Sequence, residues 1–438
     1  MRSAFDRLSR RSLPALVLAA TVPAAPSLNA QSGGSPLIEA GKRPVPVASV
    51  FHPQRLARLD STLESLITQR QLPGAVVLLV KDGRVAYHKA YGVRDVGTKV
   101  PMRPDDLFRM ASQTKAITSV AAMMLWEEGK FGLDDPLDRY LPEFRRLQVL
   151  TKFNPADSSY EARPTNRRIT IRQLFTHTSG LDYPDIGSDE FKAIYAKAGV
   201  SAGIAERNGA TLAEKMRLLA RLPLRYEPGE RFHYSISVDV LGRLVEVLSG
   251  QSLDAFLRTR LFGPLRMRDT FFGVPASHAA RLVSLHEERE GKVHAMAAPT
   301  NGDGGLDPNW STKPVTYYAG GSGLSGTTAD YARFLQMVLN GGTLDGARVL
   351  SRKTVEMMLT NQIGSLQPNY GLGFALETEQ NDHRSPKTLG SFWWSGAFQT
   401  FYWADPKEGL IALCYTNVYG STLRLGALFE TLVYGALK

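Results

Sequence analysis

A serine and a lysine three residues apart could form a nucleophilic site in this chain. Ser112 and Lys115 make its only S-x-x-K pattern, and they open a strongly apolar stretch with helical spacing. A helix turns once every ~3.6 residues, so both side chains lie on the same face. The amine could take the hydroxyl proton, and the helix N-terminus favours the negative charge that develops. The pattern alone also fits a helix-capping serine beside a solvated lysine.

A nucleophilic serine of this kind needs a second proton-transferring group. Tyr234 is the candidate, because it follows a turn-prone E-P-G-E stretch and precedes an apolar helix expected over residues 238–248. A tyrosine at such a boundary can point into a cleft and exchange a proton there. The alternative is a packing tyrosine whose hydroxyl is satisfied by one hydrogen bond.

The site also needs hydrogen-bond donors for an oxyanion. Trp394, Ser395 and Gly396 lead directly into an expected strand pair. A glycine at a strand edge lets a substrate approach the backbone, so that an amide can point at the oxyanion. The alternative is an aromatic-rich core strand.

Two further patterns resemble catalytic motifs but lack the required setting. Ser201 is the centre of a G-x-S-x-G pattern, whose serine needs a strand before it and a helix after it. Residues 188–198 have the pattern of a helix, so we do not expect Ser201 to be the nucleophile. Lys387 begins a K-T-L-G run in which Leu389 breaks the K-T-G triplet. The histidines show no H-E-x-x-H pattern and no paired spacing with cysteine, so we expect no metal and no other cofactor, and a structural role for His177.

The elements around these residues indicate an α+β fold. Apolar periodicity predicts helices over 53–71, 112–128 and 423–437 and hairpins over 75–91, 282–295 and 398–416. Hairpins near both ends, with helices between them, predict an antiparallel sheet flanked by helices, with an inserted helical domain. We expect residues 50–114 and 276–438 to form the sheet domain and residues 115–275 the mainly helical one. Ser112 then lies at the junction, where clefts tend to form.

The first thirty residues have the features of a signal peptide. Four arginines precede a short apolar stretch over residues 13–22, and a small-residue cleavage site precedes Gln31. An S-R-R-S-L run also resembles a twin-arginine signal. We therefore expect export to the periplasm or the exterior, and a Pro-, Gly- and Ser-rich linker over residues 31–49.

Composition excludes several other classes of protein. The net charge is +10, but the lysines and arginines are scattered and no nucleic-acid-binding signature accompanies them. No apolar run is long enough for a mature membrane-spanning helix. Cys414 is the single cysteine, which excludes an intrachain disulfide, and its strand-like surroundings predict a buried side chain. We expect a small-molecule substrate as the partner; the sequence does not indicate an oligomeric state.

Taken in order, these motifs resemble the family VIII carboxylesterases, on the class C side of the serine β-lactamase and penicillin-binding-protein superfamily. The ordered set is Ser112-x-x-Lys115, then Tyr234-Ser235-x-x-x-Asp239, then Trp394-Ser395-Gly396. Three further segments match the superfamily: L-F-T-H-T-S-G-L over 174–181, G-G-S-G-L-S-G-T-T-A-D over 320–330 and Y-G-L-G-F over 370–374. The similarity covers about residues 50 to 435.

The resemblance assigns roles to individual residues. It implies that Ser112 is the nucleophile, that Lys115 and Tyr234 move the protons, and that the amides of Ser112 and Ala397 hold the oxyanion. Which of Lys115 and Tyr234 is the base stays open. Trp394, Ser395 and Gly396 are expected beside the substrate.

Two departures from the superfamily pattern narrow the class of substrate that we expect. Ile236 stands where β-lactamases and D-alanyl-D-alanine peptidases usually have the asparagine of Y-x-N, and Trp394 stands where they usually have the lysine of K-T-G. The amide and cation that would hold a β-lactam are thus replaced by apolar groups, which suit an uncharged ester. We expect hydrolysis of short-chain carboxylic esters through an acyl-enzyme on Ser112, with weak hydrolysis of cephalosporins. The alternatives are a class C-like β-lactamase or D-alanyl-D-alanine carboxypeptidase, and a non-hydrolytic penicillin-recognising protein.

Overall fold

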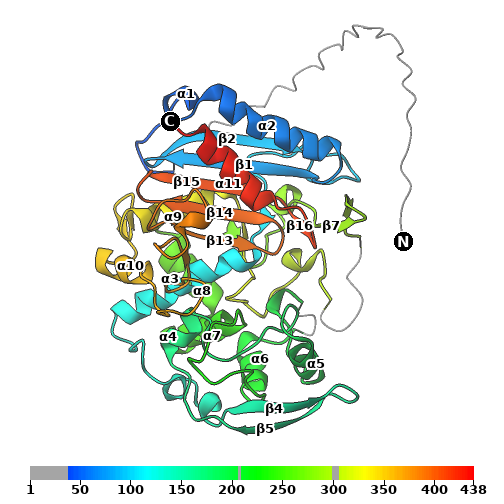
Figure 1. Cartoon of the computed structure of the whole chain (residues 1–438), viewed down its shortest axis with the longest axis vertical. Coiled ribbons are helices and arrows are strands. Elements are labelled where there is room, and N and C mark those ends of the chain that lie inside the picture. Colours follow the sequence, from blue (N-terminus) through cyan, green and yellow to red (C-terminus); the bar gives the residue numbers. More distant parts are fainter. Residues whose placement is uncertain (1–37, 206–208, 298–304) are drawn as a thin grey trace, which may run out of the picture. The chain divides into compact units, whose positions relative to one another are not determined.

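A six-stranded antiparallel sheet, built from both ends of the chain, forms the centre of the fold (Figure 1). The computed structural model describes residues 38–205, 209–297 and 305–438. In spatial order, the strands are β12 (Ala375–Leu376), β13 (Phe392–Gly396), β14 (Thr400–Asp405), β15 (Leu410–Tyr415), β1 (Gly74–Lys81) and β2 (Arg84–Gly92). The N-terminal hairpin joins the C-terminal strands where β1 pairs with β15, with Val76 opposite Tyr415. The α+β fold expected from the sequence is confirmed.

Helices cover both faces of this sheet. The β1 sequence is almost continuously apolar, as expected of a strand that is buried on both faces. Because successive side chains alternate between faces, Val77 and Leu79 pack with helices α2 (Pro53–Thr68) and α11 (Leu425–Ala436). Val76 and Leu78 belong to the larger cluster on the other face, which includes α3 (Thr114–Glu127) and α9 (Thr328–Leu339).

Helix α3 is the central helix on the site's side of the sheet. Nearly all of its residues are buried, including Lys115, whose exposed fraction is 1%. A helix that is apolar on all sides belongs in a core, and α3 packs against α7 (Ser237–Ser249). Gly129, with φ 71°, follows its end as expected. Burial therefore fixes the first turn of α3, from which Lys115 projects.

The predicted helical region contains one hairpin that the sequence analysis missed. Strands β4 (Gln148–Asn154) and β5 (Ser159–Pro164) pair far from the main sheet (Figure 1). Both are mostly exposed and polar, so they lack the alternation of apolar residues that reveals a half-buried strand. The division into a sheet domain and a helical domain stays a prediction.

The other elements are short and connect or cover this framework. The helices are α1 (Val47–Val50), α4 (Ile171–Phe175), α5 (Asp189–Lys197), α6 (Leu212–Leu219), α8 (Leu253–Leu257) and α10 (Arg352–Met358). The strands are β3 (Phe108–Arg109), β6 (Thr270–Phe271), β7 (His286–Arg289), β8 (Lys292–Ala295), β9 (Ser325–Gly326), β10 (Thr343–Leu344), β11 (Ala347–Arg348) and β16 (Val418–Tyr419). Strands β7 and β8 form the second expected hairpin, and β14 and β15 form the third.

The expected signal peptide, residues 1–30, and the first part of the expected linker lie outside the described residues. Within the rest of the linker, Ile38 is buried and its carbonyl accepts a hydrogen bond from Arg333 at 2.9 Å. Cys414 is buried on β15 as expected, and burial raises the pKa of its thiol to about 12.

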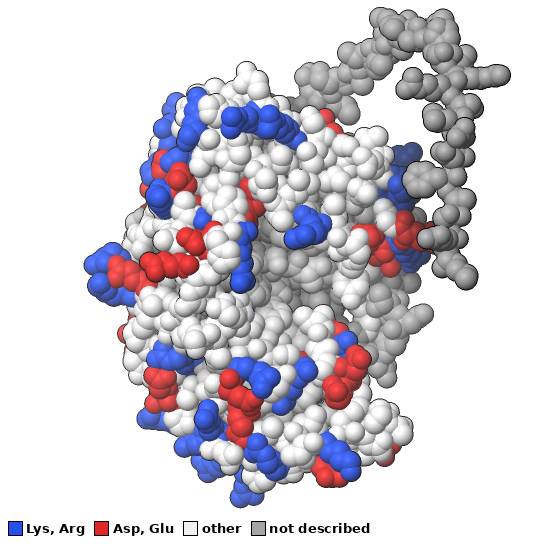
Figure 2. All heavy atoms as spheres, viewed as in Figure 1, with Lys and Arg blue, Asp and Glu red and all other residues white. Residues whose placement is uncertain are grey.

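The surface carries both charge signs. On the face shown in Figure 2, Lys and Arg are interspersed with Asp and Glu, and no continuous basic surface forms there. Among the helices that the structure describes, none is long and apolar enough to cross a membrane.

Candidate active site

Ser112 lies in a strained turn between a strand and the buried helix. Strand β3 leads into the 3-10 turn η1 (Ala111–Gln113), which continues directly into α3. Ala111 is buried and has φ 47°, a left-handed conformation that costs a residue with a side chain about 1–3 kcal/mol. Such strain persists only where the surrounding packing imposes it, and here it sets the direction of the half-buried Ser112 at the start of the helix.

The structure brings together the three residues predicted to be catalytic. The Tyr234 hydroxyl lies 2.7 Å from Ser112 Oγ, and Lys115 Nζ lies 3.4 Å from the same oxygen. One serine hydroxyl is therefore within hydrogen-bond reach of two groups that can carry its proton. This geometry comes from three separate elements: η1, the first turn of α3 and the loop before α7.

Lys115 is held by polar partners and aromatic faces. Its Nζ donates to the Gly321 carbonyl at 2.7 Å and to the Tyr183 hydroxyl at 3.3 Å. It also lies 4.6 Å from the centre of the Tyr234 ring and 5.2 Å from that of Tyr183. Cation–π contacts and oxygen acceptors both favour a cationic amine, so this surrounding offsets part of the cost of burying it.

A buried carboxylate approaches Lys115 from α7. A Cβ atom on Gly321 would lie 2.5 Å from Asp239 Oδ2 and 3.3 Å from Lys115 Nζ, so both groups converge on a position that only glycine leaves open. Burial raises the pKa of Asp239 to about 6, while the Lys115 cation acts in the opposite direction. Asp239 thus brings a buried carboxyl close to Lys115, a position that the sequence analysis did not predict although its motif contained this residue.

Tyr183 is a site residue that the sequence analysis missed. Its ring is stacked on that of Tyr234, with 5.6 Å between centroids and 15° between planes. Burial raises the pKa of Tyr183 well above its ordinary value, so it stays a neutral phenol. Its position two residues after the 174–181 motif was the available signal, but a lone tyrosine in a loop gives no pattern to detect.

Other aromatic rings fix the position of Tyr234. The His177 ring centroid lies 4.6 Å from that of Tyr234, and the Trp394 centroid lies 5.5 Å away. His177 is fully buried, which lowers its pKa well below the ordinary value, and its Nδ1 accepts a hydrogen bond from the Ser235 amide. A neutral, hydrogen-bonded His177 fits the structural role expected of it.

Strand β13 places the predicted oxyanion segment beside η1, the turn that carries Ser112. A Cβ atom on Gly396 would lie 2.3 Å from the Met110 carbonyl oxygen, so glycine is required for this approach. Thr400, opposite Gly396 on β14, donates to the same carbonyl at 3.3 Å. Ser395 is half-buried on β13, and Ala397 follows in the turn between the strands. Trp394 contacts Tyr234, so all four predicted residues lie at or next to the strand edge that flanks Ser112.

The two other sequence patterns lie in different settings. Helix α5, not a strand, precedes Ser201, so no nucleophile elbow forms there. Lys387 is buried, forms an ion pair with Glu430 and lies 5.2 Å from the Trp393 ring centre. Lys387 therefore does not occupy the place of the K-T-G lysine.

A carboxylate network borders the site on the side of Tyr234. Asp182 is buried and accepts hydrogen bonds from His233 Nε2 at 2.8 Å, Arg225 Nη1 at 2.9 Å and Ser188 Oγ at 3.1 Å. Burial by itself would raise the pKa of Asp182, but the hydrogen bonds from His233, the Tyr183 amide and Arg225 lower it overall. The network joins the 182–188 loop to the segment that carries Tyr234.

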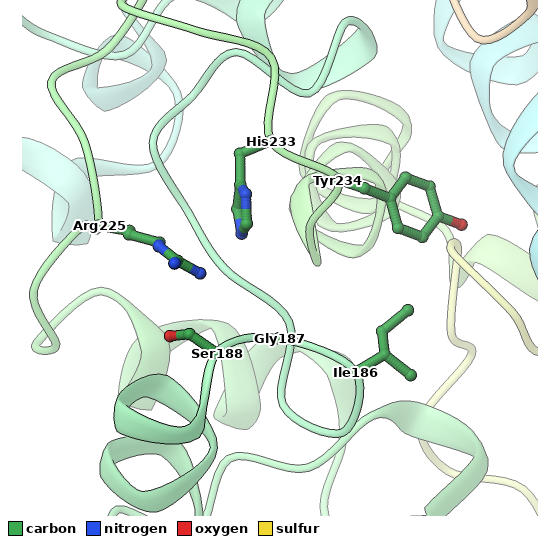
Figure 3. A pocket seen from close by; sticks show the side chains of 6 residues that line it. All are labelled: Ile186, Gly187, Ser188, Arg225, His233 and Tyr234. Atoms are coloured by element: carbon green, nitrogen blue, oxygen red, sulfur yellow. The ribbon is translucent and has the colours of Figure 1, made fainter. Parts of the chain in front are cut away.

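A cavity of about 380 Å³ opens beside this network (Figure 3). Its walls come from the 182–188 loop and from the chain around residues 225 and 233–234. The lining residues are Ile186, Gly187, Ser188, Arg225, His233 and Tyr234. Among the described residues, no group of three or more His, Cys, Asp or Glu is arranged to hold a metal ion.

The fold and the serine site together define a class of protein: serine enzymes built on the β-lactamase fold, in which a turn that carries a serine opens a buried helix beside an antiparallel sheet. Residues 59–431 match the Beta-lactamase family model, and the chain belongs to this family. The expected membership of the serine β-lactamase and penicillin-binding-protein superfamily, on its family VIII esterase side, is confirmed.

Similar proteins include esterases. Esterase EstB of Burkholderia gladioli is 33% identical over 82% of this chain and 90% of its own length. Lovastatin esterase of Penicillium rubens is 32% identical over 70% of this chain and 73% of its own. Among solved structures, EstCE1, described as a hydrolase with promiscuous acyltransferase activity, has a TM-score of 0.74 and 27% identity over 87% of this chain and 99% of its own. The chain is therefore a serine hydrolase of the β-lactamase fold, and its relatives support ester hydrolysis in general.

Proposed function

We propose that this protein is a carboxylesterase that hydrolyses short-chain esters through an acyl-enzyme on Ser112. The observation that carries the proposal is the convergence of Tyr234 and Lys115 on Ser112 Oγ, at 2.7 Å and 3.4 Å. The aromatic wall made by Trp394 supports an uncharged ester over a substrate with a carboxylate beside the reacting bond.

The reaction has two halves. Tyr234, the nearer of the two candidate groups, acts in its deprotonated form beside the Lys115 cation. Ser112 Oγ attacks the ester carbonyl while its proton passes to the Tyr234 phenolate, and the amides of Ser112 and Ala397 stabilise the oxyanion. The bond to the alcohol oxygen then breaks, and the same proton goes to the departing alkoxide. Water attacks the acyl-enzyme with the roles reversed, which releases the acid and restores the serine hydroxyl. Lys115 lies against both Ser112 and Tyr234, where its charge stabilises the negative charge that develops on either oxygen.

Weak hydrolysis of cephalosporins belongs to this proposal, because a β-lactam carbonyl would use the same nucleophile and the same oxyanion donors. The alternatives are a class C-like β-lactamase or D-alanyl-D-alanine carboxypeptidase, and a penicillin-recognising protein that is acylated without turnover. Ile236, in the place of the amide-bearing asparagine, favours the esterase, because no side-chain amide is left there to hold a lactam or peptide.

One preparation can decide between these functions. We expect kcat/KM to be higher for p-nitrophenyl butyrate than for nitrocefin, and higher for either than for a D-alanyl-D-alanine peptide. A higher value for nitrocefin would replace the esterase with a β-lactamase. A stable acyl adduct in the mass spectrum, without turnover, would indicate the binding protein.

Acyl transfer to an alcohol is a second candidate, favoured by the likeness to EstCE1. The acyl-enzyme on Ser112 would then react with an alcohol in place of water. Transfer is measured as the new ester formed when an alcohol is added during hydrolysis of p-nitrophenyl butyrate.

The compartment also remains a proposal: the basic and apolar pattern of residues 1–30 supports export from the cytoplasm. Sequencing the N-terminus of the mature protein tests this, with Gln31 as the expected first residue. A mature protein that still begins at Met1 would contradict it.

A further inference from the structure

The cavity beside Tyr234 is lined by the ring of this residue but not by Ser112 or Lys115. Figure 3 shows Arg225 and His233 directed into a shared space, with Ile186 and the Tyr234 ring on the other side. The Tyr234 hydroxyl points away from Arg225 in this view, and it is the atom that contacts Ser112. One ring therefore forms both a wall of the cavity and part of the proton-transfer group.

Arg225 has capacity to bind a further group. Its Nη1 donates to Asp182, and its guanidinium lies 5.2 Å from the centre of the Tyr226 ring. Its side chain is 28% exposed, and a guanidinium carries five N–H donors in a fixed plane. Asp182, by contrast, is buried and satisfied by its own donors, so Arg225 and not Asp182 faces a molecule in the cavity.

The loop on the opposite side keeps the cavity's shape. A Cβ atom on Gly187 would lie 2.3 Å from both Asp182 Oδ1 and the Tyr183 carbonyl oxygen, so the loop must pass close to the network without a side chain. Ile186, next to it, is 58% exposed and provides an apolar wall. The cavity thus combines an apolar wall with a positively charged donor.

Proton transfer decides which part of an ester extends into this space. The proton taken from Ser112 has to reach the departing alkoxide, so the alcohol oxygen must lie near the group that carries the proton. Lys115 is buried and does not line the cavity, whereas Tyr234 does. An alcohol group bound at the Tyr234 hydroxyl can therefore extend along the ring toward Arg225.

We propose that this cavity is the subsite for the alcohol part of the ester, and that Arg225 selects alcohols that carry a hydrogen-bond-accepting oxygen, either a carboxylate or a carbonyl. This inference rests on the proposed esterase function and adds the class of alcohol to it. In acyl transfer, an acceptor alcohol would enter by the same route. Its oxygen would bond to the acyl carbon as the bond to Ser112 Oγ breaks, and its proton would return to the serine through Tyr234.

The test uses three butyrate esters that differ only at the far end of the alcohol: 4-butanoyloxybutanoate, the matching carboxamide, and pentyl butyrate. The measured quantity is kcat/KM for each polar ester divided by that for pentyl butyrate. In Arg225→Gln we expect these ratios to fall about tenfold, the effect of losing one charge-assisted hydrogen bond. A fall for the carboxylate alone would identify a carboxylate site, and a fall for both would identify a site for any acceptor oxygen.

A neighbouring arginine provides the matched control. Arg231 lies over the same Tyr226 ring, at 4.3 Å, but is not among the residues that line the cavity. We expect Arg231→Gln to keep both ratios within about twofold of the wild type. An equal fall in Arg231→Gln would mean that general surface charge, and not the cavity, attracts the polar esters, and would overturn the proposal.

A second variant avoids the Asp182 network, whose loss could affect folding. Ile186→Trp places a large ring at the cavity wall, and we expect kcat/KM for pentyl butyrate to fall several-fold relative to methyl butyrate. Unchanged ratios in both Arg225→Gln and Ile186→Trp, in an enzyme that hydrolyses esters, would overturn the subsite alone. A wild type that hydrolyses none of the esters would overturn the proposed function as well.

Discussion

Two serines in this chain belong to patterns typical of hydrolases, and only one has the surroundings of a nucleophile. Ser112 follows a strained turn and lies within reach of Tyr234 and Lys115. Ser201 follows helix α5, and both glycines of its G-x-S-x-G pattern have structural reasons to be there. Gly199 has φ 71° and ends the helix, and a Cβ atom on Gly203 would lie 2.2 Å from the Ala319 side chain.

The difference shows that a motif's glycines can be required by packing rather than by chemistry. Helix ends favour glycine because it adopts positive φ without strain, and tight contacts favour it because it lacks a side chain. A serine between two such glycines gains no reactivity from them. Ser112 differs because the groups around it can accept and return its proton.

Replacing Ser112 and Ser201 one at a time should give the largest difference in activity between two variants. We expect Ser112→Ala to lower kcat/KM for p-nitrophenyl butyrate by about a thousandfold or more, since the acyl-enzyme cannot form. Ser201→Ala should stay within about twofold of the wild type. Full activity in Ser112→Ala, or its loss in a folded Ser201→Ala, would reverse the assignment.

Loss of the proton-transfer group should be nearly as severe. Tyr234→Phe retains the ring and its stacking but removes the hydroxyl at 2.7 Å from Ser112. We expect kcat to fall by about 10²- to 10⁴-fold, the usual range for a general acid or base, with a much smaller change in KM. Steady-state kinetics on p-nitrophenyl butyrate measure this. A change confined to KM would assign Tyr234 to binding.

A smaller effect is expected from Tyr183, which contacts Lys115 and not Ser112 itself. Tyr183→Phe removes the hydroxyl that accepts from Lys115 at 3.3 Å but preserves the stacked ring. We expect kcat to fall about tenfold, with a shift in the pH–rate profile, because the position of the amine is less well defined. Tyr195→Phe, which removes another buried hydroxyl, is the control. An unshifted profile in Tyr183→Phe would make Tyr183 a packing residue only.

The smallest expected effect is on the pH dependence of the unfolding free energy. It comes from Asp239, the buried carboxyl near Lys115. The pKa of Asp239 is raised to about 6 in the fold, so the folded state binds its proton more tightly than the unfolded state does. Its contribution to stability is complete at low pH and is lost as pH rises toward and through 6. In Asp239→Asn, the decrease in unfolding free energy between pH 5 and 7.5 should be smaller by about 1 kcal/mol.

Urea unfolding at the two pH values measures this difference, and Ser201→Ala is the matched control. The control should keep the pH dependence of the wild type, since Asp239 is intact in it. An identical pH dependence in Asp239→Asn would show that this carboxyl has an ordinary pKa in the folded protein.

The sequence was sufficient to predict the parts of the molecule that are marked by a pattern within a short stretch of residues, or by the order of such stretches along the chain. Hairpins β1–β2 and β14–β15 and helix α3 follow from apolar patterns and turn residues, and the α+β sheet follows from their order. Ser112, Lys115 and Tyr234 were found because each belongs to a motif whose chemistry needs the others. Which residues approach each other across the fold was not predictable in the same way.

Tyr183 and Asp239 illustrate that limit. Tyr183 reaches Lys115 from a loop 68 residues away along the chain, and no spacing rule connects the two. Asp239 reads as an ordinary acidic residue in the first turn of α7, where it would favour the helix N-terminus. Only the tertiary structure shows that it turns inward. The hairpin β4–β5 was missed for a different reason, since exposed polar strands carry little periodic signal.

The pairing of β1 with β15 has a consequence for the order of events during synthesis. Val76 lies opposite Tyr415, and the amide of His52 donates to the carbonyl of Ala436. A ribosome makes Ser112 and its helix long before it makes the strands that flank them. The sheet, and with it the strand edge beside Ser112, can therefore form only after strands β13 to β15 have emerged. A nascent chain would therefore carry Ser112 before the strands that complete its surroundings have been made.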